Sequence, residues 1–419
     1  ALLLPDLVRA LLARLAAGRA LPLNREAPGL AARMGAAGWP WAAFVIAALD
    51  ATGARPESAG LRVWRRLPEW EEVAPLPPPA SHPVGSAEAR ARLAAMLGAA
   101  AEQRPGQSDY AAAAAAAFAA RERKGEPHVV LAEAGTGTGK TLGYIAPASL
   151  WAERNHGAVW ISTFTRHLQR QIDAELGRLY PDPEARRRRV VVRKGRENYL
   201  CLLNLQDAVD AGLNGLTPAS VVPLGLLARW ALATADGDLF GGDLPGWFAE
   251  LFGTGSLGLA DRRGEGIHAA CDHYRRCFGE HTIRRARGAD LVVANHALVM
   301  AQAAWGGIDD ASVPLRYVFD EGHHLFDAAD GAFAVALSGW ETADLRRWLL
   351  GAEGGRSRAR GLRRRIEDLV AERPELQAPL DAALQAARAL PALGWTTRLA
   401  EPGPELTGLE PGRPNPTEA

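Results

Sequence analysis

A glycine-rich segment near the middle of the first half of the chain has the composition of a phosphate-binding loop. The apolar run from Val129 to Leu131 predicts a short strand before it, and an apolar helical pattern follows it. Glycines let backbone N–H groups wrap phosphate oxygens, while a terminal lysine and hydroxyl can bind phosphate and Mg²⁺. The residues that fit this Walker A pattern are Gly135, Thr136, Gly137, Thr138, Gly139, Lys140 and Thr141.

We therefore predict that Lys140 bridges the β- and γ-phosphates of a nucleoside triphosphate and that Thr141 binds Mg²⁺. Lysine occurs at three positions in the whole chain, so a chance match to this pattern is rare. The alternative is a structural glycine turn.

A second acidic motif follows a short apolar run at 317–319, which predicts a buried strand. Asp320 and Glu321 come directly after it, where open α/β sheets place their ligands, and His323 follows two residues later. Asp320 is the predicted Mg²⁺ carboxylate, and Glu321 is predicted to polarise the attacking water. His323 is predicted to couple the nucleotide state to a bound nucleic acid. An isolated Asp–Glu pair fits a solvated turn better, and its pairing with the glycine loop favours the catalytic interpretation.

Composition restricts the class of protein without naming a partner. The chain has 419 residues with 48 basic and 48 acidic side chains, so no overall field attracts nucleic acid or membrane. Its apolar runs are far shorter than the 18 residues that a membrane span needs, so we expect a cytoplasmic protein without a membrane partner. Three cysteines, an odd number, argue against a disulfide framework and leave free thiols or metal ligands.

The order of motifs predicts an α/β protein with an insertion, because 180 residues separate Lys140 from Asp320 and two or three βα units need far fewer. Further buried parallel strands are predicted at 159–162 and 291–294. We expect an N-terminal accessory region (1–74), a proline-rich linker (75–85), a first motor segment (86–185), a cysteine-bearing insertion (186–288), a second motor segment (289–328), a helical segment (329–400) and a disordered tail (401–419).

Six segments together resemble the XPD/DinG-like iron–sulfur superfamily 2 DNA helicases, most closely the bacterial DinG-related branch. These are Arg104 to Gln107, Glu133 to Thr141, Ile161 to Thr165 with Gln169, Lys194 to Cys201, Ala294 to Leu298, and Asp320 to His323. The resemblance implies a RecA-like P-loop NTPase domain with an inserted iron–sulfur-type domain and part of a helical arch. It also implies an adenine-side role for Gln107, ATP and Mg²⁺ as ligands, and a role in DNA repair. The expected activity is ATP-driven translocation with 5′→3′ polarity on single-stranded DNA, and unwinding at single-strand/duplex junctions.

Five residues are predicted to contact DNA. Ser162, Thr163 and Thr165 follow a strand and offer hydroxyls to phosphates. Arg196 offers a basic side chain and Tyr199 an aromatic ring. Together they suit a nucleotide, with the nucleobase stacked on the ring and its phosphate beside the arginine. The alternatives are a core tyrosine and solvated charges.

The family resemblance implies a [4Fe–4S] cluster held by four cysteines. Cys201, Cys271 and Cys277 match three of these positions, but Gly266 stands at the fourth and has no side chain. His268 is a candidate substitute ligand. A Zn²⁺ site, or free buried cysteines, remain as alternatives.

One feature of the family's motor is not found. No Gln-x-x-Gly-Arg-x-x-Arg motif of a second RecA-like domain occurs, and the arginine it supplies is worth about 10³ to 10⁵ in rate. We therefore predict an ATP-dependent DNA helicase whose turnover is low in this chain alone. The alternative is a motor-dead or truncated ATP- and nucleic-acid-binding module, and a third possibility is an unrelated P-loop kinase or ATPase.

Overall fold

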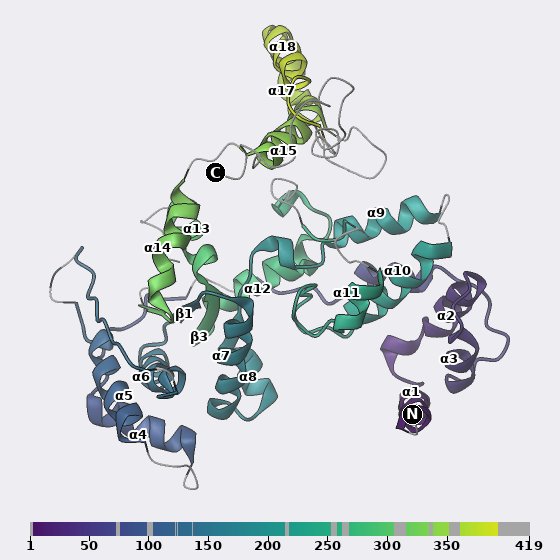
Figure 1. Ribbon diagram of the computed structural model, residues 1–419. Coiled ribbons are helices and arrows are strands. Elements are labelled where there is room, and N and C mark those ends of the chain that lie inside the picture. The colour runs from purple at the N-terminus through teal and green to yellow at the C-terminus, as the bar shows by residue number, and fades with distance from the viewer. Residues whose placement is uncertain are drawn as a thin grey trace, which may run out of the picture. The chain divides into compact units, whose positions relative to one another are not determined.

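The structure is a computed structural model, and Figure 1 shows how its elements are arranged. It describes residues 3–72, 76–98, 104–121, 123, 125–135, 137–213, 218–252, 258–261, 268–305, 316–334, 338–351 and 361–392. Thr136 of the glycine loop, Gly266 and the expected tail at 401–419 lie outside these residues.

Within the described residues, four strands form one parallel sheet in the order β2-β3-β1-β4. The strands are β1 (Val159–Thr163), β2 (Val190–Val192), β3 (Leu291–Asn295) and β4 (Arg316–Phe319). In the register of the sheet, Val159 of β1 lies beside Leu291 of β3 and Arg316 of β4. The strands expected from the apolar runs at 159–162, 291–294 and 317–319 are therefore confirmed.

Helices cover both faces of this sheet, because alternate strand residues point to opposite sides. Val159, Ile161 and Val293 face one hydrophobic core, and Trp160 and Val292 face another. The first core is completed by α4 (Ser86–Leu97), α5 (Pro105–Ala114), α6 (Lys140–Asn155) and α7 (Arg166–Leu179). The second is completed by α12 (Phe278–Arg287) and α13 (His296–Trp305). This is an α/β domain compatible with a RecA-like architecture.

The prediction of a strand before the glycine loop is wrong. Residues 129–131 carry no strand assignment, and the side chains of Val129 and Leu131 are 70% and 93% exposed. A run of three apolar residues stabilises a strand only when its backbone pairs with a sheet edge, and these residues take part in none of the described ladders.

The insertion leaves the sheet after β2 and returns at β3, its neighbour. Because Val190 to Val192 pair with Leu291 to Val293, these residues belong to the sheet although they fall inside the expected 186–288 insertion. The short helix α8 (Pro183–Arg189) leads into β2. The insertion itself contains α9 (Leu202–Leu213), α10 (Pro218–Ala231) and α11 (Gly246–Phe252), and α12 ends it.

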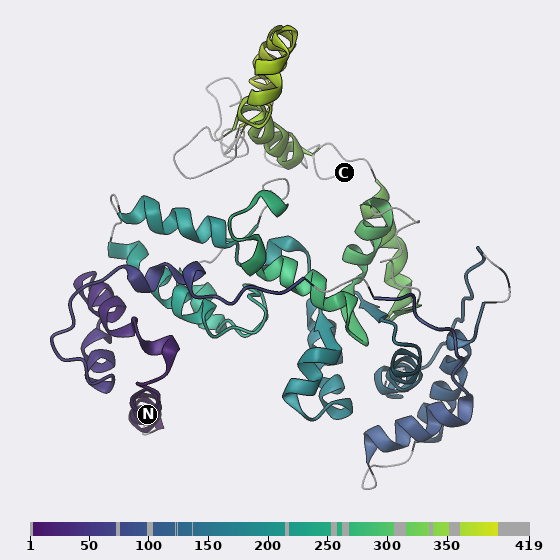
Figure 2. The ribbon, with the colours of Figure 1, turned by 180° about the vertical axis from the view of Figure 1, so that it is seen from behind.

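The N-terminal region packs on this insertion. It contains α1 (Leu3–Ala17), α2 (Ala27–Ala36) and α3 (Ala42–Ala48), and Figure 2 shows it beside α10. Leu30 and Met34 of α2 share one hydrophobic core with Leu224 and Leu227 of α10. A Cβ atom at Gly225 would lie 2.6 Å from the Met34 sulfur, so the glycine permits this close approach.

The described residues after Phe333, at 334, 338–351 and 361–392, belong to a second unit, and α14 (Leu325–Phe333) is the last helix of the first. The second unit contains α15 (Gly339–Leu350), α16 (Leu362–Arg365), α17 (Glu367–Glu372) and α18 (Gln377–Ala387), so its expected helical character is confirmed. Among the helices of the described residues, none is both long and apolar enough to cross a membrane.

Candidate nucleotide-binding site

The glycine loop ends on the first turn of α6, as a phosphate-binding loop requires. Gly137 and Gly139 have φ angles of +80° and +79°, in the left-handed region that glycine enters without strain. Gly139 occupies the N-cap of α6, so Lys140 and Thr141 lie in the helix's first turn. The unpaired N–H groups and the positive end of the helix dipole favour an anion there.

Two side chains form hydrogen bonds with the backbone of this loop, one from just before α5 and one from α5. Arg104 donates a hydrogen bond to the Gly137 carbonyl at 3.1 Å, and the buried Gln107 amide donates to the Gly139 carbonyl at 2.9 Å. A Cβ atom at position 139 would lie 2.2 Å from the Gln107 amide nitrogen, so the close contact requires glycine. Gln107, predicted on the adenine side, therefore lies beside the loop with its amide engaged by protein.

The fold brings the two predicted catalytic motifs together. The Lys140 ammonium lies 3.2 Å from the Glu321 carboxylate, although 181 positions separate them. Their side chains are 28% and 35% exposed, so this pair is open to water and to a ligand. A lysine that pairs with a carboxylate here can exchange that partner for a phosphate group.

Asp320 is held at the end of β4 by its neighbours on β1. Its backbone N–H donates to the Ser162 carbonyl at 2.8 Å, and the Thr163 hydroxyl donates to its carboxylate at 3.2 Å. Burial raises the pKa of Asp320, and the nearby Glu321 charge adds to the shift, while the Thr163 hydrogen bond and Lys140 oppose it. Burial and the Asp320 charge also raise the pKa of Tyr144 on α6 well above its ordinary value.

A buried pair behind the acidic motif escaped sequence reasoning. The Ser162 hydroxyl and His296 Nδ1 lie 2.7 Å apart, and the two residues are 0% and 1% exposed. Burial lowers the pKa of His296, while the backbone carbonyls of Glu321 and Asp320 oppose this shift. Because the Ser162 carbonyl accepts the Asp320 N–H, Ser162 links His296, at the start of α13, to the backbone of the acidic motif. The Ala294-to-Leu298 motif contained this signal, because a histidine directly after a buried strand faces the same sheet edge as Asp320.

The acidic motif has an unusual backbone at its second residue. Glu321 has a φ angle of +54°, which costs a non-glycine residue about 1 kcal/mol or more. Its carboxylate lies between Lys140 Nζ at 3.2 Å and His323 Nδ1 at 3.6 Å. The strained backbone thus aims Glu321 at the loop lysine, while His323 remains exposed on the other side.

Most of the predicted DNA-contacting side chains are already engaged. Ser162 and Thr163 are fully buried, and their hydroxyls form hydrogen bonds with His296 and Asp320, respectively, so neither hydroxyl is open to DNA in this conformation. The Thr165 hydroxyl caps α7 by accepting a hydrogen bond from Leu168 N at 3.2 Å.

Tyr199 is a core residue, and this corrects the prediction that it stacks on a nucleobase. It is 4% exposed, its hydroxyl accepts a hydrogen bond from Lys194 N at 3.1 Å, and burial raises its pKa to about 12. The Tyr199 ring belongs to the hydrophobic core of the insertion. Burying its apolar surface there is favourable, and a buried ring cannot stack on a ligand. Arg196 is partly exposed and pairs with Glu280 and Asp261.

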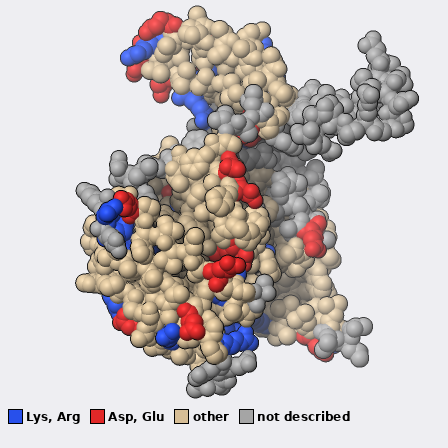
Figure 3. All heavy atoms as spheres, turned by 60° about the vertical axis from the view of Figure 1, so that its left-hand side comes forward, with Lys and Arg blue, Asp and Glu red and all other residues tan. Residues whose placement is uncertain are grey.

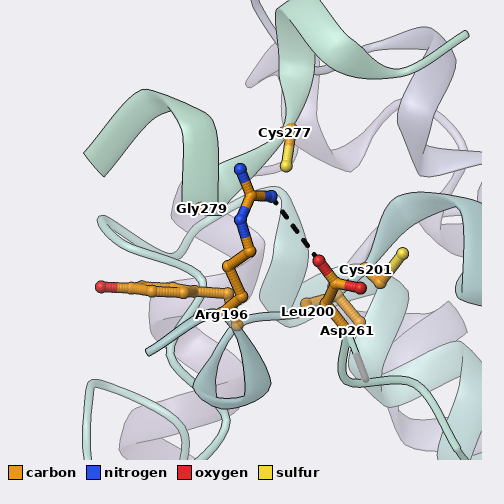
Figure 4. Close-up of a pocket in the computed structure, with 7 residues that line it drawn as sticks. Arg196, Leu200, Cys201, Asp261, Cys277 and Gly279 are labelled. Atoms are coloured by element: carbon orange, nitrogen blue, oxygen red, sulfur yellow. Dashed lines mark ion pairs between the residues drawn. The ribbon is translucent and has the colours of Figure 1, made fainter. Parts of the chain in front are cut away.

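All three cysteines belong to the insertion, and two of them line the same cavity. Cys201 and Cys277 border it together with Arg196, Asp261 and Gly279, among others. Figure 4 shows the Arg196 guanidinium extending toward Cys277 and pairing with Asp261 beside Cys201. Arg196 also donates a hydrogen bond to Nδ1 of the exposed His268 at 3.1 Å.

These residues do not fit a four-thiolate iron–sulfur cluster. Cys271 is not among the residues lining the cavity, and the Arg196 guanidinium extends into it toward Cys277. Burial raises the pKa of all three thiols, that of Cys201 to about 12. Among the described residues, no three His, Cys, Asp or Glu side chains form a group suited to a metal ion.

Comparison with known proteins gives the family context. No protein-family model matches the chain. An ATP-dependent helicase DinG from Mycobacterium tuberculosis is 34% identical over 255 residues, which cover 56% of this chain and 36% of the relative. The ATP-dependent DNA helicase YoaA of Escherichia coli is 34% identical over 234 residues, 53% of this chain and 34% of the relative. A 3'-5' exonuclease DinG of Bacillus subtilis is 30% identical over 241 residues, 54% of this chain and 23% of the relative.

The matched part of the chain thus spans about a third or less of the length of these curated relatives. The comparisons confirm the resemblance seen in the motifs: about half of this chain is related to the DinG-like ATP-dependent helicases.

Proposed function

We propose that this chain carries the ATP-binding motor domain of an ATP-dependent DNA helicase. The relatives' names support an ATP-hydrolysing helicase, and one observation connects that function to this chain's own residues. Lys140 and Glu321, predicted from two motifs 181 positions apart, lie 3.2 Å from each other at the carboxyl edge of the sheet. A phosphate-binding lysine and a water-polarising carboxylate need this proximity to act on one phosphoryl group.

The geometry suggests how the residues act on ATP. The backbone N–H groups of the loop and the Lys140 ammonium bind the phosphates, and Lys140 gives up its Glu321 contact as it does so. Glu321 is then free to orient a water molecule toward the terminal phosphoryl group. Thr141 and Asp320 would hold Mg²⁺, which neutralises phosphate charge when bound. Ser162, with its buried bond to His296, fixes the backbone from which the acidic residues project.

The finer properties follow from the family resemblance. We propose single-stranded DNA and single-strand/duplex junctions as substrates, and movement with 5′→3′ polarity. The proposal includes no iron–sulfur cluster, because the described cysteines do not form a four-thiolate set. In anaerobically purified protein we expect well below one iron per chain, with the Gly266→Cys variant, which provides a fourth cysteine, as the comparison.

A second candidate is an ATP- and nucleic-acid-binding module without turnover. DNA-stimulated ATP hydrolysis separates the two candidates, because a binding module binds both ligands without releasing phosphate.

The nucleotide site is tested by equilibrium binding of a fluorescent ATP analogue. Replacing the Lys140 ammonium removes a charge-assisted phosphate contact worth about 1.5–3 kcal/mol, so Lys140→Ala should weaken binding roughly 10- to 100-fold. Thermal stability should change little, because the Lys140–Glu321 pair is partly exposed. Arg188→Ala, on an exposed ion pair of α8, is the control and should bind normally. Undiminished affinity in Lys140→Ala would contradict the assignment.

A further inference from the structure

We propose that the stacked rings of Phe164 and His324 form a nucleobase-binding site for single-stranded DNA. This inference rests on the proposed function and identifies where on this chain a base of the DNA strand is held. The site lies at the carboxyl edge of the sheet, where Phe164 follows β1 and His324 follows the acidic motif after β4.

The two rings already have the arrangement of a stacking platform. Their centroids are 3.9 Å apart with planes 13° from parallel, and His323 lies 4.1 Å beyond His324. Phe164 is 44% exposed, although the two residues before it are completely buried. The stack with His324 restricts the Phe164 side chain before any ligand binds, which lowers the entropy cost of binding.

An apolar ring left in water at this position calls for a ligand with a flat apolar face. Covering a phenylalanine ring removes apolar surface from water at roughly 25 cal/mol per Å². Every nucleobase has such a face, so stacking tolerates any sequence, as a translocating protein requires. Tyr199, the aromatic predicted for this task, is buried, whereas Phe164 is open.

Charge around the rings favours a base over a phosphate. The Asp320 and Glu321 carboxylates belong to the same short segment as His324, and Glu321 lies 3.6 Å from His323. These negative charges disfavour a phosphate on the rings themselves but leave a neutral base unaffected. On the face drawn in Figure 3, acidic and basic side chains are scattered among neutral ones, so that face presents no broad basic field.

The phosphates that flank a stacked base lie on the side of Phe164 that leads into α7. The helix α7 begins two residues later with Thr165 as its N-cap, and its N-terminal N–H groups point toward this loop. The proposal thus places the base on the rings and the backbone toward the first turn of α7.

The test compares two ligands with equal phosphate counts. The full chain is titrated with a 12-nucleotide oligo-dT and with an abasic 12-mer at the same salt concentration. If base stacking contributes, the chain should prefer oligo-dT by about tenfold, the effect of one stacked base. Phe164→Ala should lose that preference by weakening oligo-dT binding about tenfold while leaving abasic binding unchanged. Phe164→Trp keeps a ring and should retain the preference.

Phe326→Ala is the matched control. Phe326 is an exposed phenylalanine too, 77% accessible on α14, but it lies outside the ring stack. This variant should bind both ligands as the unaltered chain does. A 2-aminopurine base within the oligonucleotide provides a second readout, since stacking on Phe164 should quench its fluorescence and Phe164→Ala should abolish the quenching.

Three results would overturn the proposal. Unchanged oligo-dT binding by Phe164→Ala would show that the ring holds no base. An equal loss for both ligands would indicate a phosphate-side or folding defect. Absence of any DNA binding by the unaltered chain would reject this site together with the DNA-binding part of the proposed function, while ATP-analogue binding through Lys140 would test the nucleotide site separately.

Discussion

Lys194 is the residue for which the structure most sharply changes the functional interpretation. In the sequence it stands near Arg196 and Tyr199 and resembles part of a DNA-binding segment. In the structure its ammonium pairs with Asp238, and the two side chains are 7% and 3% exposed. The Asp238 carboxylate also accepts a hydrogen bond from Phe240 N at 2.8 Å. We therefore predict that Lys194 stabilises the insertion and does not bind DNA.

The perturbation is Lys194→Met, which keeps the length of the side chain and removes its charge. Asp238 would then be left as a buried carboxylate without a cation, and breaking a buried pair from one side costs about 3–5 kcal/mol. Adding Asp238→Asn removes the stranded charge and keeps an oxygen for the Phe240 N–H. The double variant should therefore recover most of the loss and lie within about 2 kcal/mol of the unaltered chain.

The assay is urea unfolding followed by tryptophan fluorescence, combined with oligo-dT binding. Arg188→Met is the control, because it breaks an ion pair whose side chains are 67% and 81% exposed and should cost less than about 0.5 kcal/mol. A cost below about 1 kcal/mol for Lys194→Met would refute the reasoning. The reasoning would equally fail if the variant lost DNA affinity at unchanged stability.

Three further results are expected. Because burial raises the pKa of Cys201 to about 12, iodoacetamide should alkylate it slowly at pH 8 in the folded chain and rapidly in urea, and fast labelling of the folded chain would contradict its burial. Burial lowers the pKa values of His273, His281 and His296, so the unfolded chain takes up protons first and the free energy of unfolding should fall as the pH drops below about 6.5; a urea midpoint that rises on acidification would reverse this sign. Ser162→Ala should cost about 1–3 kcal/mol by leaving the imidazole nitrogen of His296 unpaired, whereas Ser162→Thr should cost less if the larger side chain is accommodated, as unfolding curves of both would show.

The centre of the sheet could be predicted from the sequence because β1 and β3 are buried on both faces. Apolar runs such as 159–162 and 291–294 are short, continuous and bounded by polar residues, and helices on both faces explain why no polar alternation appears. The same rule failed at 129–131, where Leu131 is 93% exposed. The residue types at 129–131 match those of a buried strand. Whether they form a strand depends on pairing with a sheet edge, and the sequence pattern does not show that pairing.

The candidate site shows a similar division. That Lys140 and Glu321 lie near each other could be predicted, because each belongs to a short motif recognisable on its own. The number of residues between the motifs does not matter, since the fold brings both to the same edge of the sheet. The burial of Ser162 and Tyr199 was not predictable, because a hydroxyl or a phenol after a strand can point to solvent or to the interior with equal sequence patterns. Tertiary packing resolves this: the Ser162 hydroxyl bonds to a histidine 134 positions away.

The way the insertion joins the sheet gives it a direct route to the acidic motif. At its start, Arg193 N donates to the Val293 carbonyl at 2.7 Å, and at its end Asp290 N donates to the Arg189 carbonyl at 2.9 Å. Both ends are therefore fixed to adjacent strands, so a displacement of the insertion acts on the β2–β3 ladder and not on a loose tether. The strand β3 leads directly into His296, whose buried bond to Ser162 reaches the residue that also fixes Asp320 N. The Arg193–Val293 hydrogen bond, the backbone of β3 and the His296–Ser162 hydrogen bond thus connect the insertion to Asp320, the proposed Mg²⁺ carboxylate.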